Sequence, residues 1–451
     1  MKADILIIGA GPGGYETALT AARRGKSVVL FNGGKLGGTC LNEGCIPTKC
    51  LCRNAEIVTM FKEGDKFGID DFAFTLNYNK VIERKREVVD TLRKGVETLL
   101  TQAKVTVVNS NASFKDSKTL TANGEEYEGE RIIIATGSIS KSLPIPGHDL
   151  ECVMDSSAIL ELEYVPAQLT IIGGGVIGME FASIFHQLGS KVTVIEYMKQ
   201  ILPPFDSDIA KRLKQILTKK GINIITGAAA KEIRQNEFYE IEVVYDVKGK
   251  EEKIVSSDLL MAVGRAPRVE GLNLEAAGVT YSAKGIPVDD FMQTNVPGIF
   301  AIGDVNGRMM LAHVASAQGE RALNVINGEK DELRFDLVPS AVFTVPECGM
   351  VGKTEEQCKE EKREILIGTS FFRANGKALA LGEPDGICKL IFNKDDGKLI
   401  GAHIMGTEAA DLTQQCADLM NRDTTLTQLR NIIFGHPTVS EVIMSAAKAV
   451  K

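Results

Sequence analysis

The sequence has no tryptophan, only five histidines among its 451 residues, and no block of five or more lysines and arginines. Its net charge is −7. A chain with this balance has no general attraction to nucleic acid or to an anionic membrane surface. No apolar stretch approaches the ~18 residues that a membrane span requires, because glycines and charges interrupt every candidate. We therefore expect neither a nucleic-acid partner nor a membrane partner.

Cysteine is also scarce, with nine residues in the whole chain. That number is too small for a disulfide-based scaffold, and the odd count leaves at least one thiol free. In a reducing compartment, a close cysteine pair is more often catalytic than structural. The apolar start resembles part of a signal peptide, but it breaks at Gly9 and no cleavage site of small residues follows. We therefore expect a cytoplasmic protein.

Glycine, in contrast, is abundant. There are 44 glycines, which is about one residue in ten, against a usual share of about 7%. The remaining composition, 44% hydrophobic and 25% charged, is that of an ordinary globular protein. A length of 451 residues corresponds to about three domains. The positions of the glycines therefore become the main guide to the fold.

The first glycine-rich turn lies near the N-terminus. The apolar run Asp4–Ile8 predicts a buried parallel strand, Tyr15–Arg24 a helix and Ser27–Phe31 a second strand. The turn between the first strand and the helix has the pattern GxGxxG, with glycines at Gly9, Gly11 and Gly14. Alone this pattern is weak, and it can be a turn without a ligand. Between a strand and a helix it places backbone N–H groups where they can hold a pyrophosphate.

A second unit of the same kind follows. A strand at Leu169–Ile172 precedes the turn, a helix runs to about Leu188, and a strand at Val192–Glu196 completes the unit; the turn has its glycines at Gly173, Gly175 and Gly178. The carboxylate of Glu196 can accept the ribose hydroxyls of NAD and would repel the 2′-phosphate of NADP. In the first unit Asn32 occupies the equivalent position, and it is a neutral and weaker acceptor.

Other segments complete the predicted architecture. Tyr78–Gln102 is charged and periodic, which predicts a long surface helix, and Lys248–Lys253 predicts a hairpin turn. Short β-type runs predict further strands at Val105–Asn109, Arg131–Ile134, Ile222–Thr226, Glu232–Arg234 and Glu240–Tyr245. From Phe335 onward strands and helices mix, and no glycine-rich turn of this kind recurs. The predicted fold class is α/β, with two Rossmann-like domains and a C-terminal α+β domain.

Two cysteines, Cys40 and Cys45, lie just after the first unit. On a regular helix, five positions give an axial rise of about 7.5 Å, more than the usual Cα limit of about 6.8 Å for a disulfide. Gly44 and Pro47 could provide the bend that a bridge would need. Spacing alone leaves two readings open, a redox disulfide or two unrelated thiols, because Cys50 stands at the same distance from Cys45.

The residues around Cys40 and Cys45 form a longer motif that is more specific than the spacing of the cysteines. Gly37–Lys49, GGTCLNEGCIPTK, closely resembles the redox-active motif of the pyridine nucleotide–disulfide oxidoreductases, and the dihydrolipoamide dehydrogenase branch in particular. Four further segments resemble motifs of the same family in the same order: Ala135–Gly137, Gly298–Asp304, Phe343–Glu347 and His436–Glu441. The resemblance covers essentially the whole chain.

The resemblance implies a set of cofactor-binding residues. For FAD they are Gly9, Gly11, Gly14, Asn32, Lys49, Thr136, Gly137 and Asp304; for NAD they are Gly173, Gly175, Gly178, Glu196 and Gly264. Glu180 is expected to form an ion pair with Lys49 near the flavin, although the pair could also be purely structural. The implied domains are an FAD-binding domain at 1–147, an NAD-binding domain at 148–264, a return to the FAD-binding part at 265–334, and a dimerisation domain at 335–451.

The resemblance also implies a reaction. Cys40 is then the thiol that exchanges with substrate, Cys45 the thiol that contacts the flavin, His436 the base, and Glu441 the group that orients it. The implied activity is NAD-dependent oxidation of protein-bound dihydrolipoamide by a homodimer in which His436 comes from the opposite subunit. The partner would carry a lipoyl group and belong to a 2-oxo acid dehydrogenase complex or to the glycine cleavage system.

Several alternatives stay in consideration. Glutathione reductase-like enzymes use NADPH and usually carry arginines after the second unit. This chain has Tyr197 and Met198 there instead, which disfavours that branch. Single-thiol coenzyme A disulfide reductases are disfavoured because both Cys40 and Cys45 are present. Mercuric reductases carry a further cysteine pair near the C-terminus, where this chain ends SAAKAVK. A non-catalytic flavin-binding redox subunit is the alternative from a different class, and the complete set of reactive residues argues against it.

Overall fold

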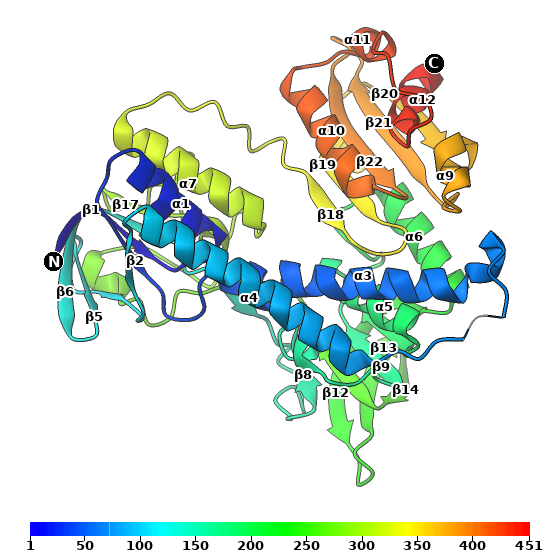
Figure 1. Ribbon diagram of the computed structural model, residues 1–451, viewed down its shortest axis with the longest axis horizontal. Helices are drawn as coiled ribbons and strands as arrows, with labels where there is room; N and C mark the ends of the chain where they lie inside the picture. Colours follow the sequence, from blue (N-terminus) through cyan, green and yellow to red (C-terminus); the bar gives the residue numbers. More distant parts are fainter. Residues whose placement is uncertain (72) are drawn as a thin grey trace.

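A computed structural model describes residues 1–71 and 73–451. The chain folds into three lobes, each organised around its own β-sheet (Figure 1). Two of these sheets combine parallel strands with helices, and the third is antiparallel. This arrangement confirms the predicted α/β fold class.

The first lobe is built on a seven-stranded sheet in the order β3-β2-β1-β6-β5-β4, with β17 paired to β6. Its strands are β1 (Lys2–Ile8), β2 (Val28–Phe31), β3 (Thr106–Val108), β4 (Ser113–Phe114), β5 (Thr119–Ala122), β6 (Glu125–Ile134) and β17 (Ile299–Ala301). Strand β1 lies in the interior of the sheet, paired with β2 on one edge and β6 on the other. Its second half is apolar, as expected for a strand that is buried on both faces.

Helices α1 (Pro12–Arg23), α2 (Gly38–Glu43), α4 (Tyr78–Gln102) and α7 (Ala312–Asn327) accompany this sheet, with short 3₁₀ helices η3 (Leu274–Ala277) and η4 (Gly303–Asn306). Helix α3 (Cys45–Lys62), which η1 (Gly64–Phe67) follows, leads away from the sheet and packs in the core of the second lobe (Figure 1). Helix α4 begins where predicted because the side chain of Asn77 accepts a hydrogen bond from the backbone N–H of Lys80. It ends at Gln102 and buries one periodic apolar stripe.

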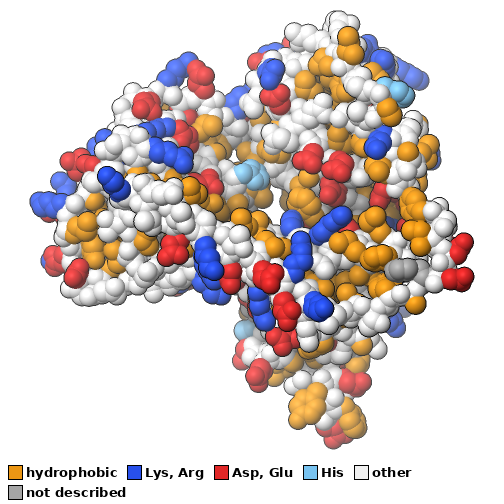
Figure 2. All heavy atoms as spheres, in the orientation of Figure 1, with side chains coloured by type: hydrophobic (Ala, Val, Ile, Leu, Met, Phe, Trp, Pro, Cys, Tyr) orange, Lys and Arg blue, Asp and Glu red, His pale blue; other side chains and the backbone are white. Residues whose placement is uncertain are grey.

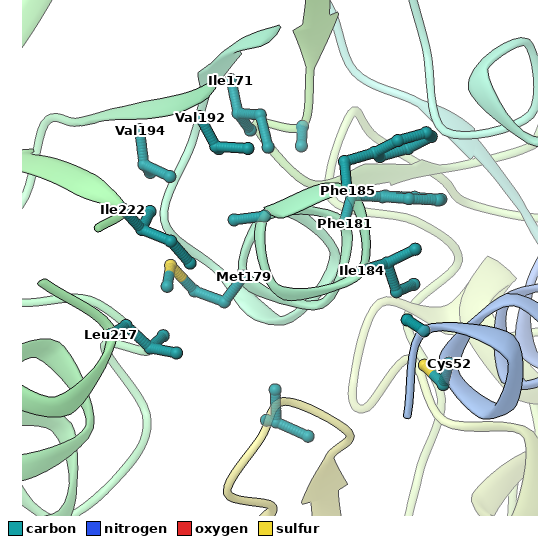
Figure 3. Close-up of a cluster of buried hydrophobic side chains, with 14 of the residues drawn as sticks. Cys52, Ile171, Met179, Phe181, Ile184, Phe185, Val192, Val194, Leu217 and Ile222 are labelled. Carbon is teal, nitrogen blue, oxygen red and sulfur yellow. The ribbon is translucent and has the colours of Figure 1, made fainter. Parts of the chain in front are cut away.

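The second lobe has a five-stranded parallel sheet in the order β11-β10-β9-β15-β8. Its elements are β8 (Val153–Met154), η2 (Ile159–Glu161), β9 (Gln168–Ile172), α5 (Val176–Leu188), β10 (Lys191–Glu196), α6 (Ser207–Lys220), β11 (Asn223–Thr226) and β15 (Asp258–Met261). Helix α5 is buried on most sides, with Met179, Phe181 and Phe185 among its core residues (Figure 3). The second predicted strand–turn–helix–strand unit is therefore present.

A three-stranded antiparallel sheet extends from this lobe. It consists of β12 (Ala228–Gln235), β13 (Ile241–Val247) and β14 (Lys250–Ser256). The prediction of a turn over Lys248–Lys253 was too long: only residues 248 and 249 form the turn, and Lys250 already pairs with Val247. The charged side chains that suggested a loop lie on the exposed part of β14.

Two short strands, β7 (Ser138–Ser140) and β16 (Arg265–Pro267), pair where the chain passes between the first and second lobes. After β16 the chain returns to the first lobe, where β17 pairs with β6 in parallel. Residues that are far apart in the sequence therefore meet at this crossing.

The third lobe is a five-stranded antiparallel sheet in the order β18-β19-β22-β21-β20. Its elements are β18 (Ser340–Val342), β19 (Cys348–Gly352), α8 (Glu355–Glu360), β20 (Ile365–Phe371), η5 (Phe372–Ala374), α9 (Gly376–Ala380), β21 (Ile387–Asn393), β22 (Leu399–Met405), α10 (Ala409–Asn421), α11 (Leu426–Arg430) and α12 (Glu441–Ala449). Among the described residues, no helix is long and apolar enough to cross a membrane.

A buried ionic cluster joins the second and third lobes. Lys389 of β21 lies 3.0 Å from Asp206, whose side chain caps helix α6. It also contacts Asp208 at 2.8 Å and Glu355 at 2.7 Å. The side chains of Lys389 and Asp206 are almost completely buried, so each charge depends on the other for compensation.

Candidate functional site

The redox motif folds as two helices with a break between them. Helix α2 ends at Glu43, Gly44 leaves the helical conformation with φ −148° and ψ −108°, and α3 begins at Cys45. The break brings Cys40 and Cys45 to a Cα–Cα distance of 4.7 Å, and the two are joined by a disulfide. This distance lies within the usual range for such a bond. The spacing alone allowed either a redox disulfide or two unrelated thiols, and the structure shows the disulfide.

A cavity of about 1290 Å³ has this disulfide in its wall. Pockets for drug-sized ligands usually have volumes of ~300–1000 Å³, so this one suits a larger molecule. Ten of the predicted site residues line it together: Gly9, Gly11, Asn32, Cys40, Cys45, Lys49, Thr136, Gly137, Glu180 and Asp304. Figure 2 shows a deep notch between the lobes on the same molecule.

The glycine turn at one end of the cavity fits a dinucleotide. A Cβ on Gly14 would collide with the carbonyl oxygen of Gly9, and a Cβ on Gly9 would collide with that of Ala135. The turn therefore packs closely against the end of β6 only with glycine at these positions. Helix α1 starts after Gly11 without any side-chain cap, so its first N–H groups remain available for phosphate oxygens.

Asn32 lies next to this turn and is buried. Its amide nitrogen donates to the carbonyl of Gly34 at 3.0 Å and to Oδ1 of Asn109 at 3.1 Å. Both amide protons are therefore used, and the side-chain oxygen, which accepts the backbone N–H of Gly34 at 3.4 Å, keeps a second lone pair as an acceptor. Asn32 can accept a hydrogen bond from a ribose hydroxyl, but without a negative charge.

Lys49 and Glu180 form the predicted ion pair across the cavity wall. The ammonium of Lys49, on α3, lies 2.9 and 2.8 Å from the two carboxylate oxygens of Glu180, on α5. Glu180 also accepts the backbone N–H of Phe343 at 3.0 Å, and the ammonium lies 4.3 Å from the centre of the Phe343 ring. Phe343 therefore connects the third lobe to the Lys49–Glu180 ion pair. In the sequence, Phe343 is identified only as the first residue of a family motif.

The far wall contains Asp304 and Thr136. Asp304 accepts a hydrogen bond from Ser138, and Thr136 donates to the carbonyl of Arg268 at 2.7 Å. Gln318, at 2% exposure, accepts the backbone N–H of Gly303 at 2.7 Å and so holds the turn that carries Asp304. Asp304 is part of η4, and its carboxylate bonds Ser138 rather than capping the start of that helix. No local sequence pattern indicated Ser138.

The second glycine turn borders the same cavity through Val176 and Ile177, the two residues between Gly175 and Gly178. The predicted residues Gly173, Gly175, Gly178, Glu196 and Gly264 are themselves not part of the lining. The buried carboxylate of Glu196 accepts the backbone N–H groups of Gly174 and Met198. Helix α5 begins after Gly175 without a side-chain cap, as α1 does after Gly11. Turn, helix start and carboxylate thus repeat the arrangement of a dinucleotide site.

His436 and Glu441 form a pair at the start of α12. Nδ1 of His436 lies 3.0 Å from Oε1 of Glu441, and the other carboxylate oxygen accepts the backbone N–H of Thr438 at 3.0 Å. The hydrogen bond from His436, followed by that from Thr438, lowers the pKa of Glu441. The His436 side chain is 78% exposed, and neither residue lines the cavity that contains the disulfide. Within one chain the pair and the disulfide are therefore separate.

The thiols downstream of the disulfide are buried in α3, as expected for core residues. Cys52 packs in the same cluster as Phe181 and Ile184 (Figure 3), and its sulfur lies 3.6 Å from the carbonyl oxygen of Phe343. Burial raises the pKa of Cys52 to about 12 and also raises that of Cys50. Thiols in this state do not act as nucleophiles near neutral pH.

Comparison with known proteins agrees with this site. Residues 3–319 match the family model described as pyridine nucleotide-disulphide oxidoreductase, and residues 338–447 match its dimerisation domain. The chain is 38% identical to a dihydrolipoyl dehydrogenase of Bacillus subtilis, over 98% of this chain and 97% of that protein. It is also 38% identical to one of Corynebacterium glutamicum, over 99% and 97%.

A solved structure is similar over the whole length. The HOCl-induced flavoprotein disulfide reductase RclA from Escherichia coli, as a Cu(II) complex, superposes with a TM-score of 0.90 at 31% identity and full coverage of both chains. Among the described residues of the present chain, no three His, Cys, Asp or Glu side chains gather as a metal site. Sequence motifs, fold and relatives agree, and the chain belongs to the pyridine nucleotide–disulphide oxidoreductase family.

Proposed function

We propose that this protein is a dihydrolipoyl dehydrogenase, which oxidises dihydrolipoyl groups through the Cys40–Cys45 disulfide with FAD and NAD as cofactors. One observation carries the proposal: the disulfide lies in the wall of the same large cavity that the first glycine turn borders. The dihydrolipoyl dehydrogenases that are 38% identical over nearly the full length support this substrate class.

FAD would be held by the residues that line this cavity. The N-terminus of α1 would bind the pyrophosphate, Asn32 the ribose of the adenosine half, and Asp304 a hydroxyl of the ribitol chain. The Lys49–Glu180 pair would lie beside the ring. When bound, FAD supplies two-electron transfer between the dithiol pair and NAD.

The thiol chemistry is carried by Cys40 and Cys45. A substrate thiolate attacks Sγ of Cys40, the Cys40–Cys45 bond breaks, and Cys45 leaves as a thiolate. The second substrate thiol, after losing its proton, attacks the substrate sulfur of this mixed disulfide and releases Cys40. The substrate leaves as lipoamide, and the enzyme has gained two electrons and carries two reduced cysteines. Transfer of those electrons to NAD⁺ forms NADH and restores the disulfide.

Each attack needs a base that removes a proton from a substrate thiol. His436 can do so through Nε2, because Glu441 accepts from Nδ1 and stabilises the protonated ring. Since the pair does not line the cavity of its own chain, His436 would act on the disulfide of the second subunit. The match to a dimerisation domain over residues 338–447 supports a homodimer.

The second glycine turn would bind NAD. Glu196 is buried next to that turn with its carboxylate fixed by two backbone N–H groups. A fixed carboxylate there accepts ribose hydroxyls and repels a 2′-phosphate, which favours NAD over NADP. Gly264 follows β15 in a conformation with φ +103°, which favours glycine. Gly264 would let the chain pass close to the nicotinamide half.

The wider setting follows from the substrate. The dihydrolipoyl group would be presented by a separate protein, from a 2-oxo acid dehydrogenase complex or the glycine cleavage system, in the cytoplasm. We also propose domain boundaries near residues 147, 264 and 334, where the chain passes between the sheets. The dimerisation domain would then comprise residues 335–451.

The test is the rate at which purified protein oxidises dihydrolipoamide with NAD, with NADP as the parallel control. Fast turnover with NAD and at least tenfold slower turnover with NADP is the expected result. A yellow protein that fails with dihydrolipoamide but reduces glutathione or coenzyme A disulfide would contradict the proposal. That result would place the protein with other disulfide reductases of the fold, as its likeness to RclA allows.

A further inference from the structure

Three polar side chains from distant parts of the sequence form a chain of hydrogen bonds in the cavity wall. Nε of Arg265 donates to Oγ of Ser138 at 2.7 Å, and Ser138 donates to Oδ2 of Asp304. A second guanidinium nitrogen of Arg265 donates to the carbonyl of Ser138 at 2.8 Å. All three residues line the cavity that holds the redox disulfide.

The direction of these hydrogen bonds is fixed by chemistry. A guanidinium can only donate, an ionised carboxylate can only accept, and a serine hydroxyl has one proton. Because Arg265 donates to the hydroxyl oxygen, the hydroxyl proton must point to Asp304. Ser138 is 8% exposed, so water competes little for either bond. Such a chain is polarised, and each bond strengthens its neighbour.

The three residues also mark a structural junction. Ser138 begins β7 and Arg265 begins β16, the two strands that pair where the chain crosses between the first two lobes. Asp304 lies in η4, directly after β17 has returned to the first sheet. Among the described residues, no other side-chain hydrogen bond reaches the Asp304 carboxylate. Its orientation therefore depends on the crossing strands.

We propose that Arg265 and Ser138 are positioning residues that orient Asp304 for FAD. With Oδ2 occupied by Ser138, Asp304 keeps Oδ1 to accept a hydroxyl of the ribitol chain. This inference rests on the proposed function, because it takes FAD as the molecule in the cavity. It adds that the strands leading to and from the NAD-binding lobe control the strength with which FAD is held.

The experiment measures how fast the holoenzyme releases FAD, followed by the rise in flavin fluorescence. Ser138→Ala should release FAD about tenfold faster, because Asp304 loses the one side-chain donor that the described part of the chain gives it. Ser138→Thr keeps the hydroxyl and should stay within threefold of the unaltered protein. Ser140→Ala, two residues further along the same strand, is the matched control and should not change the rate.

A double-mutant cycle separates positioning from a general loss of packing. Arg265→Met should also speed release, and Arg265→Met combined with Ser138→Ala should be little worse than the stronger single variant. Effects that multiply, or a Ser138→Ala rate within twofold of the unaltered protein, would overturn the inference. If such a result is obtained while the unaltered protein still holds FAD and oxidises dihydrolipoamide, only the roles of Arg265 and Ser138 are refuted. If it does not bind FAD, the proposed function and this inference both fail.

Discussion

The replacement Glu441→Gln tests how the base is oriented. One carboxylate oxygen of Glu441 accepts from His436 and the other from the backbone N–H of Thr438. Glutamine has a single carbonyl oxygen, so one of these two donors loses its acceptor. Hydrogen bonds to charged groups contribute ~1.5–3 kcal/mol and neutral ones ~1 kcal/mol. The difference, about 0.5–2 kcal/mol, corresponds to a rate loss of about 2- to 30-fold.

The assay is anaerobic stopped-flow reduction of the enzyme by dihydrolipoamide, followed by reoxidation with NAD. Glu441→Gln should slow the first half-reaction by this factor and leave the second unchanged, because only the first needs a base at the substrate thiol. Glu360→Gln makes the same chemical change at an exposed position of the same lobe and serves as control. Reduction of the Glu441 variant within twofold of the control would refute the assigned role.

Three further changes probe other parts of the molecule. Glu196→Ala should raise the KM for NAD at least tenfold with FAD content unchanged; an unaltered preference for NAD over NADP would contradict its role. Lys389→Met should destabilise the protein by ~3–5 kcal/mol, because it leaves the buried Asp206 carboxylate unpaired; an unchanged melting temperature would show that the charge is compensated otherwise. Burial raises the pKa of Glu347 from 4.5 to about 7. The folded state thus binds this proton more tightly, and the resulting stability is present below pH 4.5 and lost as the pH rises through 7. Glu347→Gln should therefore gain thermal stability relative to the unaltered protein between pH 5 and pH 8, and a pH-independent difference would refute this.

The local features of the fold could be predicted from the sequence because each depends on residues close together in the chain. Helix Tyr78–Gln102 has the predicted bounds, since its apolar period and its Asn77 cap are both local. The strands at Gln168–Ile172 and Lys191–Glu196 lie within one residue of the predicted ones. The hairpin at Lys248 was placed too broadly because exposed strand residues and turn residues are equally polar.

Features that depend on distant segments could not be read in this way. Ser138, Arg265 and Asp304 come together only because the chain crosses between lobes twice. Neither Ser138 nor Arg265 belongs to a pattern that identifies its partner. The contact of Phe343 with Glu180 likewise joins lobes that sequence periodicity does not relate. The proposed approach of His436 to the disulfide of a second subunit depends on subunit assembly, and composition carries no signal for it.

The central claim is that dihydrolipoyl electrons pass through Cys40 and Cys45, and thiol counting tests it most directly. The holoenzyme would be reduced anaerobically with one equivalent of dihydrolipoamide, alkylated under native conditions, and analysed by peptide mass spectrometry. The account predicts new alkylation at Cys40 and Cys45, its loss when NAD is added before the alkylating agent, and no change at the buried thiols Cys50 and Cys52. Reduction of the flavin without new alkylation at Cys40, or alkylation of Cys40 and Cys45 that persists when NAD is added first, would contradict it.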